Sequence, residues 1–355
     1  MAREPVAWDV AARVASVVGG REPYSRSYHL AAARSELEDL VPLGEALVAR
    51  ETGLTPPSPA RVVLTDREGW VRANIDSFRR LLAPLLDRLA RRPLPGPLAD
   101  AGRVAAGVQM GLLLGWMSTR VLGQYDLLLV EEGEERAKQD IVYLVAPNLF
   151  QLEHRYGFPP REFRLWVVLH ELTHRAQFTG VPWLRPYFSG LVSDTVGGLE
   201  TDPRQLLERV RRVVGELAAG RNPLAEAGIV SLVASAEQRV ALGRIQALMA
   251  LLEGHGDVVM DRAGGGSLPS AGRFAAVLHE RRGSAQGLGR LVGQLLGIEA
   301  KLRQYEQGER FIAAVEAEGG PELLSLVWRG PDWLPAAEEL AEPDRWVRRV
   351  RPGAA

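Results

Sequence analysis

The chain has 355 residues, of which 46% are hydrophobic and 25% are charged, and this is enough to bury a substantial core in one large domain or two closely packed ones. Its formal net charge is −1, so no overall electrostatic field favours nucleic acid or an anionic membrane surface as a partner. The absence of cysteine excludes disulfides, a thiol nucleophile and thiolate ligands, so histidine and carboxylate side chains must hold any zinc ion.

Most predicted elements are helices, because apolar residues recur at helical spacing along most of the chain. No secretory signal follows Met1, so we expect a cytoplasmic protein. In chain order, the pattern predicts a strand over 61–65, helices over 76–91 and 104–117, strands over 125–130 and 141–146, and helices over 161–178, 202–220, 235–261 and 285–307. The apolar run 104–117 is too short to span a bilayer, so we expect a buried helix there.

The strands over 125–130 and 141–146 flank the charged stretch 131–140, so we expect a hairpin around a solvated loop. The predicted fold class is therefore mainly α (α+β), with a small β-sheet and a large helical portion. No shift in composition marks a firm domain boundary. We divide the chain into an N-terminal helical region, 1–100, and a catalytic region, 101–355, with one continuous domain as the alternative.

The predicted helix 161–178 contains the motif His170-Glu171-Leu172-Thr173-His174, which has the HExxH pattern. On a helix, His170 and His174 lie one turn apart on the same face, so both imidazoles can bind one ion. Zinc lowers the pKa of a bound water towards neutrality, and Glu171 is placed to take that water's proton and pass it to a leaving group. The motif therefore predicts a zinc hydrolase, with two histidine ligands and Glu171 as the general base.

A catalytic zinc site needs a third protein ligand, and the candidates lie in the predicted helix 235–261. Glu253 and Asp257 are four residues apart, so a helix places both carboxylates on one face. We predict that Glu253 completes a His-His-Glu site and that Asp257 accepts a hydrogen bond from the far nitrogen of a ligating histidine. His255 points elsewhere on an ideal helix, but the glycines on either side of it could allow a distortion, so His255 is the alternative ligand.

Two further side chains could donate a hydrogen bond to the transition state. These are His279, for which a solvated helix end is the favoured interpretation, and Tyr305, for which packing is favoured.

Several segments, taken together and in order, resemble the zincin-like metallopeptidase family (type 2). These segments are Trp8–Ala11, Val121–Asp126, Leu144–Leu149, His170–Phe178, Trp183–Leu184, Leu252–His255, Gln304–Gly308 and Trp346–Val350. The family is found mainly in actinobacteria, and its members are labelled as hydrolases or associated with biosynthesis of the deazaflavin redox coenzyme. The resemblance implies a zincin-like metallopeptidase core and a bound Zn²⁺, with His170 and His174 as ligands and Glu171 as general base.

The spacing of the predicted third ligand differs from that in better-known zincins with a glutamate ligand. Here 78 residues lie between His174 and Glu253, many more than in those peptidases. We expect a zinc metallohydrolase, a metalloprotease or amidohydrolase, acting on a peptide or amide substrate whose backbone pairs with the extended segment 141–146. The alternative is a non-catalytic, zinc-stabilised scaffold or accessory protein of deazaflavin coenzyme biosynthesis. The sequence gives neither the scissile bond nor the oligomeric state.

Overall fold

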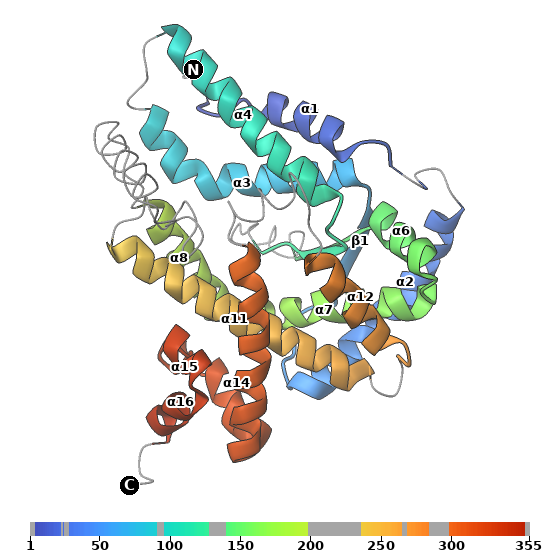
Figure 1. Ribbon diagram of the computed structural model, residues 1–355, viewed down its shortest axis with the longest axis vertical. Helices are drawn as coiled ribbons and strands as arrows, with labels where there is room; N and C mark the ends of the chain where they lie inside the picture. Colours follow the sequence, from blue (N-terminus) through green and yellow to red (C-terminus); the bar gives the residue numbers. More distant parts are fainter. Residues whose placement is uncertain are drawn as a thin grey trace. The chain divides into compact units, whose positions relative to one another are not determined.

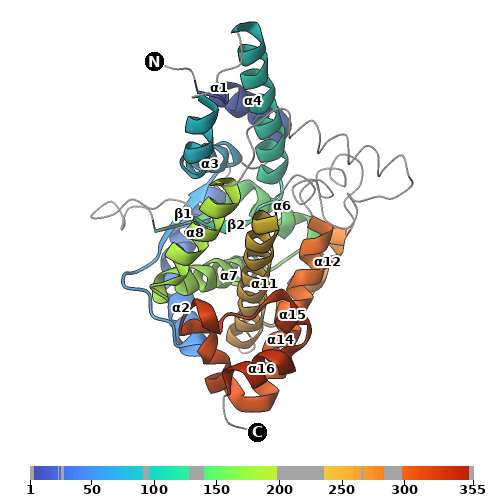
Figure 2. The same ribbon diagram turned by 90° about the vertical axis from the view of Figure 1, so that its left-hand side faces the viewer.

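A computed structural model describes residues 4–22, 24, 28–90, 96–127, 140–197, 236–264, 268–283 and 298–351 (Figures 1 and 2). The described residues are mostly helical and include one three-stranded sheet, so the predicted mainly α (α+β) class is confirmed. The chain forms two compact units. Unit 1 consists of Met1–Gly180 and Val259–Arg282, and unit 2 consists of Val181–Val258 and Gly283–Ala355. The division of function at residue 100 stays a prediction.

Unit 1 places a small sheet among helices. Its helices are α1 (Trp8–Gly19), α2 (His29–Thr52), α3 (Arg67–Ala90), α4 (Gly96–Ser118), α6 (Ala146–Tyr156), α7 (Pro160–Gly180) and α12 (Ala271–Gly283), and its strands are β1 (Arg61–Thr65), β2 (Gly123–Tyr125) and β3 (Ile141–Val145). The predicted strand 61–65 and helix 161–178 are confirmed, and α3 begins nine residues before the predicted helix 76–91.

The sheet has the order β1-β3-β2, so β3 is its central strand. β1 pairs with β3 in parallel, with Arg61 opposite Ile141, and β2 pairs with β3 antiparallel, with Tyr125 opposite Val142. The antiparallel pairing of β2 with β3 agrees with the predicted hairpin. β2 covers Gly123–Tyr125, however, and shares only Tyr125 with the predicted strand 125–130, and residues 128–139 lie outside the described part. The prediction that 141–146 pairs with a substrate backbone is wrong, because β1 and β2 occupy both edges of β3.

The helices α1 and α4 lie side by side in both views (Figures 1 and 2). Their contact surface belongs to a core that includes Ala11, Trp70 and Leu114, all of them fully buried. The opposite face of α4 is exposed at Ala105, Gln109 and Leu112, and the side chain of Leu112 is 49% exposed. The run 104–117 is thus helical as predicted, but only one of its faces is buried.

No helix in the described part of the chain combines the length and the apolar character needed to cross a membrane.

Unit 2 is built on two long helices. Its elements are α8 (Leu184–Gly197), α11 (Ala236–Gly264, of which Ala236–Val258 belongs to this unit), α14 (Ile298–Leu324), the 3₁₀ helices η1 (Ser325–Trp328) and η2 (Pro331–Trp333), α15 (Ala337–Ala341) and α16 (Pro343–Val350). Leu251 of α11 and Phe311 of α14 lie in one buried cluster with Trp346 of α16. The ring of Trp346 packs edge-on against Phe311, and its Nε1 donates to the Trp333 carbonyl at 2.8 Å.

The predicted helices of unit 2 are confirmed in part. The prediction of a helix over 235–261 agrees with α11 to within three residues at either end. The described part of the predicted helix 285–307 is helical but continues to Leu324, with non-helical backbone at Gly319 and Gly320 that allows a kink. The predicted helix 202–220 lies outside the described residues.

Candidate metal centre

Helix α7 carries the zinc motif and is buried on nearly every face. Its sequence from Arg161 to Phe178 contains no glycine or proline, so nothing interrupts the hydrogen-bond ladder. Apolar residues recur around the helix, and such a helix is stable only when other elements enclose it. It packs against α2, α6, β2 and β3 within unit 1.

One buried arginine fixes the first half of α7 to its neighbours. Arg164 donates to both carboxylate oxygens of Glu153 on α6 at 2.8 Å and to Glu36 on α2 at 2.8 Å. Burial alone lowers the pKa of Arg164, but its hydrogen bonds to Glu153 and Glu36 outweigh this and raise the pKa above the usual value. Arg164 therefore stays charged and joins three helices.

A second arginine fixes the other half of α7, directly after His174. Arg175 is 1% exposed and donates from two nitrogens to one oxygen of Asp140 at 2.8 and 2.6 Å. It also donates to Glu45 on α2 at 3.1 Å and to the Ser58 carbonyl at 2.6 Å. Asp140 was predicted to lie in a solvated loop, and this is wrong, because the residue is buried at the start of β3 and pairs with Arg175.

The two motif histidines face one another on α7. The Nε2 atoms of His170 and His174 lie 3.2 Å apart, and the ring planes meet at 85°. A tetrahedral zinc ion with Zn–N distances of about 2.0 to 2.1 Å separates two ligand nitrogens by about 3.3 to 3.4 Å. The observed spacing therefore suits two imidazole ligands of one ion with almost no movement.

Gln177, one turn after His174, determines which nitrogen of that ring faces the other histidine. Its Oε1 accepts a hydrogen bond from Nδ1 of His174 at 3.0 Å. A proton held on Nδ1 leaves the lone pair of Nε2 directed away from Gln177, which is the form that ligates a metal. Sequence reasoning missed Gln177, although its i+3 position on the motif helix was the available signal.

The predicted third ligand, Glu253, lies on α11 in unit 2, whereas the two motif histidines belong to unit 1. The role of Glu253 as a ligand therefore stays a prediction. All three side chains are half-buried. Two nitrogens and one carboxylate oxygen are donors that suit Zn²⁺ and leave one of its four positions for water or substrate.

The other candidates on α11 have different surroundings. α11 is helical from Ala236 to Gly264, through the glycines that flank His255. His255 is buried in unit 2, where its ring lies edge-on to Trp328 with the centroids 5.1 Å apart. Asp257 is half-buried, one helical turn after Glu253.

His279 lies on α12 and Tyr305 on α14, but their side chains lie outside the described part of the structure. Their role as transition-state donors stays a prediction.

Glu171 is only 6% exposed, and its carboxylate lies against strand β2. The backbone N–H of Tyr125 donates to Oε2 of Glu171 at 2.9 Å. This contact joins the candidate general base to the sheet, and no local sequence pattern could have revealed it, because 46 residues separate the two partners.

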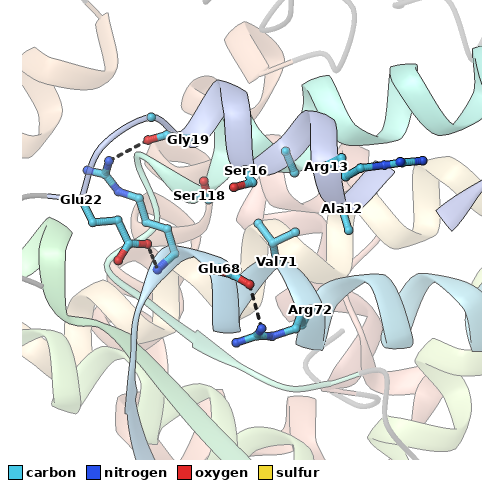
Figure 3. A pocket seen from close by; sticks show the side chains of 12 residues that line it. Ala12, Arg13, Ser16, Gly19, Glu22, Glu68, Val71, Arg72 and Ser118 are labelled. Atoms are coloured by element: carbon cyan, nitrogen blue, oxygen red, sulfur yellow. Dashed lines mark hydrogen bonds and ion pairs between the residues drawn. The ribbon is translucent and has the colours of Figure 1, made fainter. Parts of the chain in front are cut away.

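A cavity of about 380 Å³ lies elsewhere in unit 1, between α1, the start of α3 and the end of α4 (Figure 3). The charges in its wall are engaged with the protein. Arg72 pairs with Glu68 at 2.8 Å, Arg67 donates to the Gly19 carbonyl at 2.9 Å, and the carboxylate of Glu22 accepts from the Arg67 backbone N–H at 2.8 Å (Figure 3). The contact of Arg67 with Gly19 joins α3 to the end of α1, whereas the pair of Arg72 and Glu68 lies within α3. The histidines of α7 do not line the cavity.

The chain is similar to known proteins over nearly its whole length. The family model described as zincin-like metallopeptidase matches residues 6–347. Among solved structures, the chain is similar to one from Chloroflexus aurantiacus described as "a putative hydrolase with a novel fold", with 31% sequence identity, a TM-score of 0.71, and coverage of 98% of this chain and 100% of that one. No curated protein matches. With HExxH on a buried helix and a family match over nearly its whole length, the chain belongs to the zincin-like metallopeptidase family.

Proposed function

We propose that the protein is a zinc-dependent metallohydrolase that cleaves a peptide or other amide bond. The observation that carries the proposal is the pair of imidazole nitrogens 3.2 Å apart on the helix that also carries Glu171. Membership of the zincin-like metallopeptidase family and the similarity to a protein described as a hydrolase support the same reaction class. A purely structural zinc site has no use for a carboxylate between its two histidines.

In this proposal His170, His174 and Glu253 hold the ion, because two histidine nitrogens and one carboxylate oxygen suit Zn²⁺. Bound zinc supplies Lewis acidity, which polarises the substrate carbonyl and makes water a stronger acid. Gln177 keeps the proton of His174 on Nδ1, so that Nε2 stays available as a ligand.

Glu171 moves the proton. Its Oε2 accepts a hydrogen bond from the Tyr125 N–H, which fixes the orientation of the carboxylate, and one carboxylate oxygen receives a proton from the attacking water. The same oxygen then delivers that proton to the leaving amine nitrogen as the C–N bond breaks, so that the carboxylate returns to its charged form. A peptide or simple amide suits this order of proton transfers, because its amine leaving group must be protonated before it departs.

The variant Glu171→Gln tests the mechanism. It preserves the shape of the side chain and removes the basic oxygen, so we expect one zinc per chain, as in the wild type, and a loss of about 10²- to 10⁴-fold in the turnover of peptides from a mixed library. His174→Ala serves as the control for metal loss, and it should lose both zinc and turnover. Metal content is measured by mass spectrometry of the purified proteins.

Two results would contradict the proposal. One is full turnover by Glu171→Gln, which would show that another group moves the proton. The other is a zinc-loaded wild type that cleaves no peptide in the library and whose zinc has a fourth protein ligand. That second result would favour the alternative of a non-catalytic, zinc-stabilised scaffold or accessory protein.

A further inference from the structure

Strand β2 is one of the two outer strands of the sheet, and its backbone groups alternate between two sides. The side towards β3 is occupied, since the Asp126 N–H donates to the Ile141 carbonyl at 2.9 Å and the Val145 N–H donates to the Leu122 carbonyl at 2.8 Å. Alternation along an antiparallel strand directs the N–H of Tyr125 to the opposite side, away from β3. This N–H needs a partner outside the sheet.

The partner is the side chain of Glu171. Its Oε2 accepts from the Tyr125 N–H at 2.9 Å, and both groups are buried. A hydrogen bond from a backbone amide to a carboxylate is stronger than one between neutral groups. The sheet therefore holds one oxygen of Glu171 in a fixed place.

Gly123, two residues earlier on the same side of β2, makes room for the carboxylate. A Cβ atom added at residue 123 would lie 2.6 Å from Cγ, 2.7 Å from Oε1 and 2.9 Å from the carboxyl carbon of Glu171. Real Cβ atoms essentially never approach other heavy atoms this closely. Glu171 can adopt its observed position only because residue 123 has no side chain.

We propose that Gly123 and the N–H of Tyr125 together form a positioning element for the general base. The proposal rests on the proposed function of Glu171. Gly123 leaves the space, the Tyr125 N–H holds Oε2, and the pairing of β2 with β3 makes the element rigid. The element acts on the orientation of the carboxylate rather than on the metal, so changing it should alter turnover more than zinc binding.

Gly123→Ala tests this, because the added methyl group must displace the carboxylate. We expect zinc affinity, measured by competition with a chelator, to stay within about threefold of the wild type. For the best-cleaved peptide of a mixed library, we expect kcat to fall by about 100-fold with little change in KM. Independently of any substrate, the Tyr125 amide of the zinc-loaded protein should lose its protection from hydrogen exchange, and Glu171→Gln should shift its amide proton resonance.

Gly44→Ala is the matched control. Its added Cβ would lie 2.9 Å from Cδ1 of Leu172, which is on the same helix as Glu171 but contacts α2. This variant also places a methyl group against side chains of α7, and it should leave kcat and the protection of the Tyr125 amide unchanged. If Gly44→Ala lowers kcat as much as Gly123→Ala, the effect of residue 123 is general destabilisation and the proposal is overturned.

A double variant covers the case in which Gly123→Ala does not fold. Glu171→Asp withdraws the carboxylate by one methylene group, so adding it to Gly123→Ala should restore folding, and failure to restore it overturns the proposal.

The further inference and the proposed function can fail separately. Wild-type kcat in a folded Gly123→Ala overturns the positioning element, while the proposed function stands if Glu171→Gln is inactive. An active Glu171→Gln refutes the proposed function instead, and the exchange of the Tyr125 amide still reports whether the contact exists.

Discussion

At the scale of single residues, the site depends on which nitrogen of His174 carries its proton. Gln177 accepts from Nδ1 and is fully buried, so the ring cannot turn without breaking a buried hydrogen bond. We expect Gln177→Ala to weaken zinc binding by about 10- to 100-fold, and Gln177→Glu to keep or strengthen it, because a carboxylate accepts the same hydrogen bond more strongly. Chelator competition measures both affinities.

Gln238→Ala is the control for Gln177→Ala. Gln238 is also buried and donates to the Thr195 carbonyl at 2.9 Å, at the start of α11 and about four helical turns before Glu253. Its loss should leave zinc affinity unchanged. An equal loss of affinity in both variants would mean that Gln177 contributes only stability.

The sequence predicted the residues of the site that follow from spacing on one helix. Helical geometry fixes the positions of His170, Glu171 and His174 relative to one another. The Nε2 atoms of the two histidines lie 3.2 Å apart, as expected for residues one turn apart on the same face. Gly123 and Tyr125 could not be predicted, because their contact with Glu171 depends on how a strand and a helix pack. Nothing in the sequence distinguishes Gly123 from other glycines, because its role lies in the space that its missing side chain leaves for Glu171.

At the scale of elements, α4 approaches α1 through a row of glycines spaced four residues apart. A Cβ atom added at Gly111 would lie 2.6 Å from the Ala11 carbonyl oxygen, and Gly107 and Gly115 meet the backbone of α1 in the same way. A backbone carbonyl cannot rotate aside, so the helices must separate. We expect Gly111→Ala to lower the free energy of unfolding by about 1 to 3 kcal/mol in urea denaturation.

Gly102→Ala, in the same helix, has nothing within 4 Å of the added atom and should stabilise the protein by up to about 1 kcal/mol, because alanine favours the helix. The same sign of change in both variants would contradict the close approach of α1 and α4.

The sequence indicated that α4 is a helix but not that one of its faces stays exposed, because an apolar run does not show which element packs against it.

At the scale of the whole molecule, periodicity predicted the fold class but not the distant pairings that fix the site. The pairing of Asp140 with Arg175 joins the start of β3 to the motif helix across 35 residues, in a stretch whose charges indicated solvent. The third ligand poses the same problem, since 78 residues lie between His174 and Glu253. Helical spacing selected Glu253 as a candidate, and only tertiary structure can bring it to the histidines.

The central claim is that His170, His174 and Glu253 bind one zinc ion. Anomalous X-ray diffraction at the zinc edge, from crystals of the zinc-loaded protein, tests this claim most directly. We predict one strong peak about 2.0 to 2.2 Å from Nε2 of His170, Nε2 of His174 and a carboxylate oxygen of Glu253, with water at the fourth position. A peak at another place, or two imidazoles with no zinc between them, would contradict the claim.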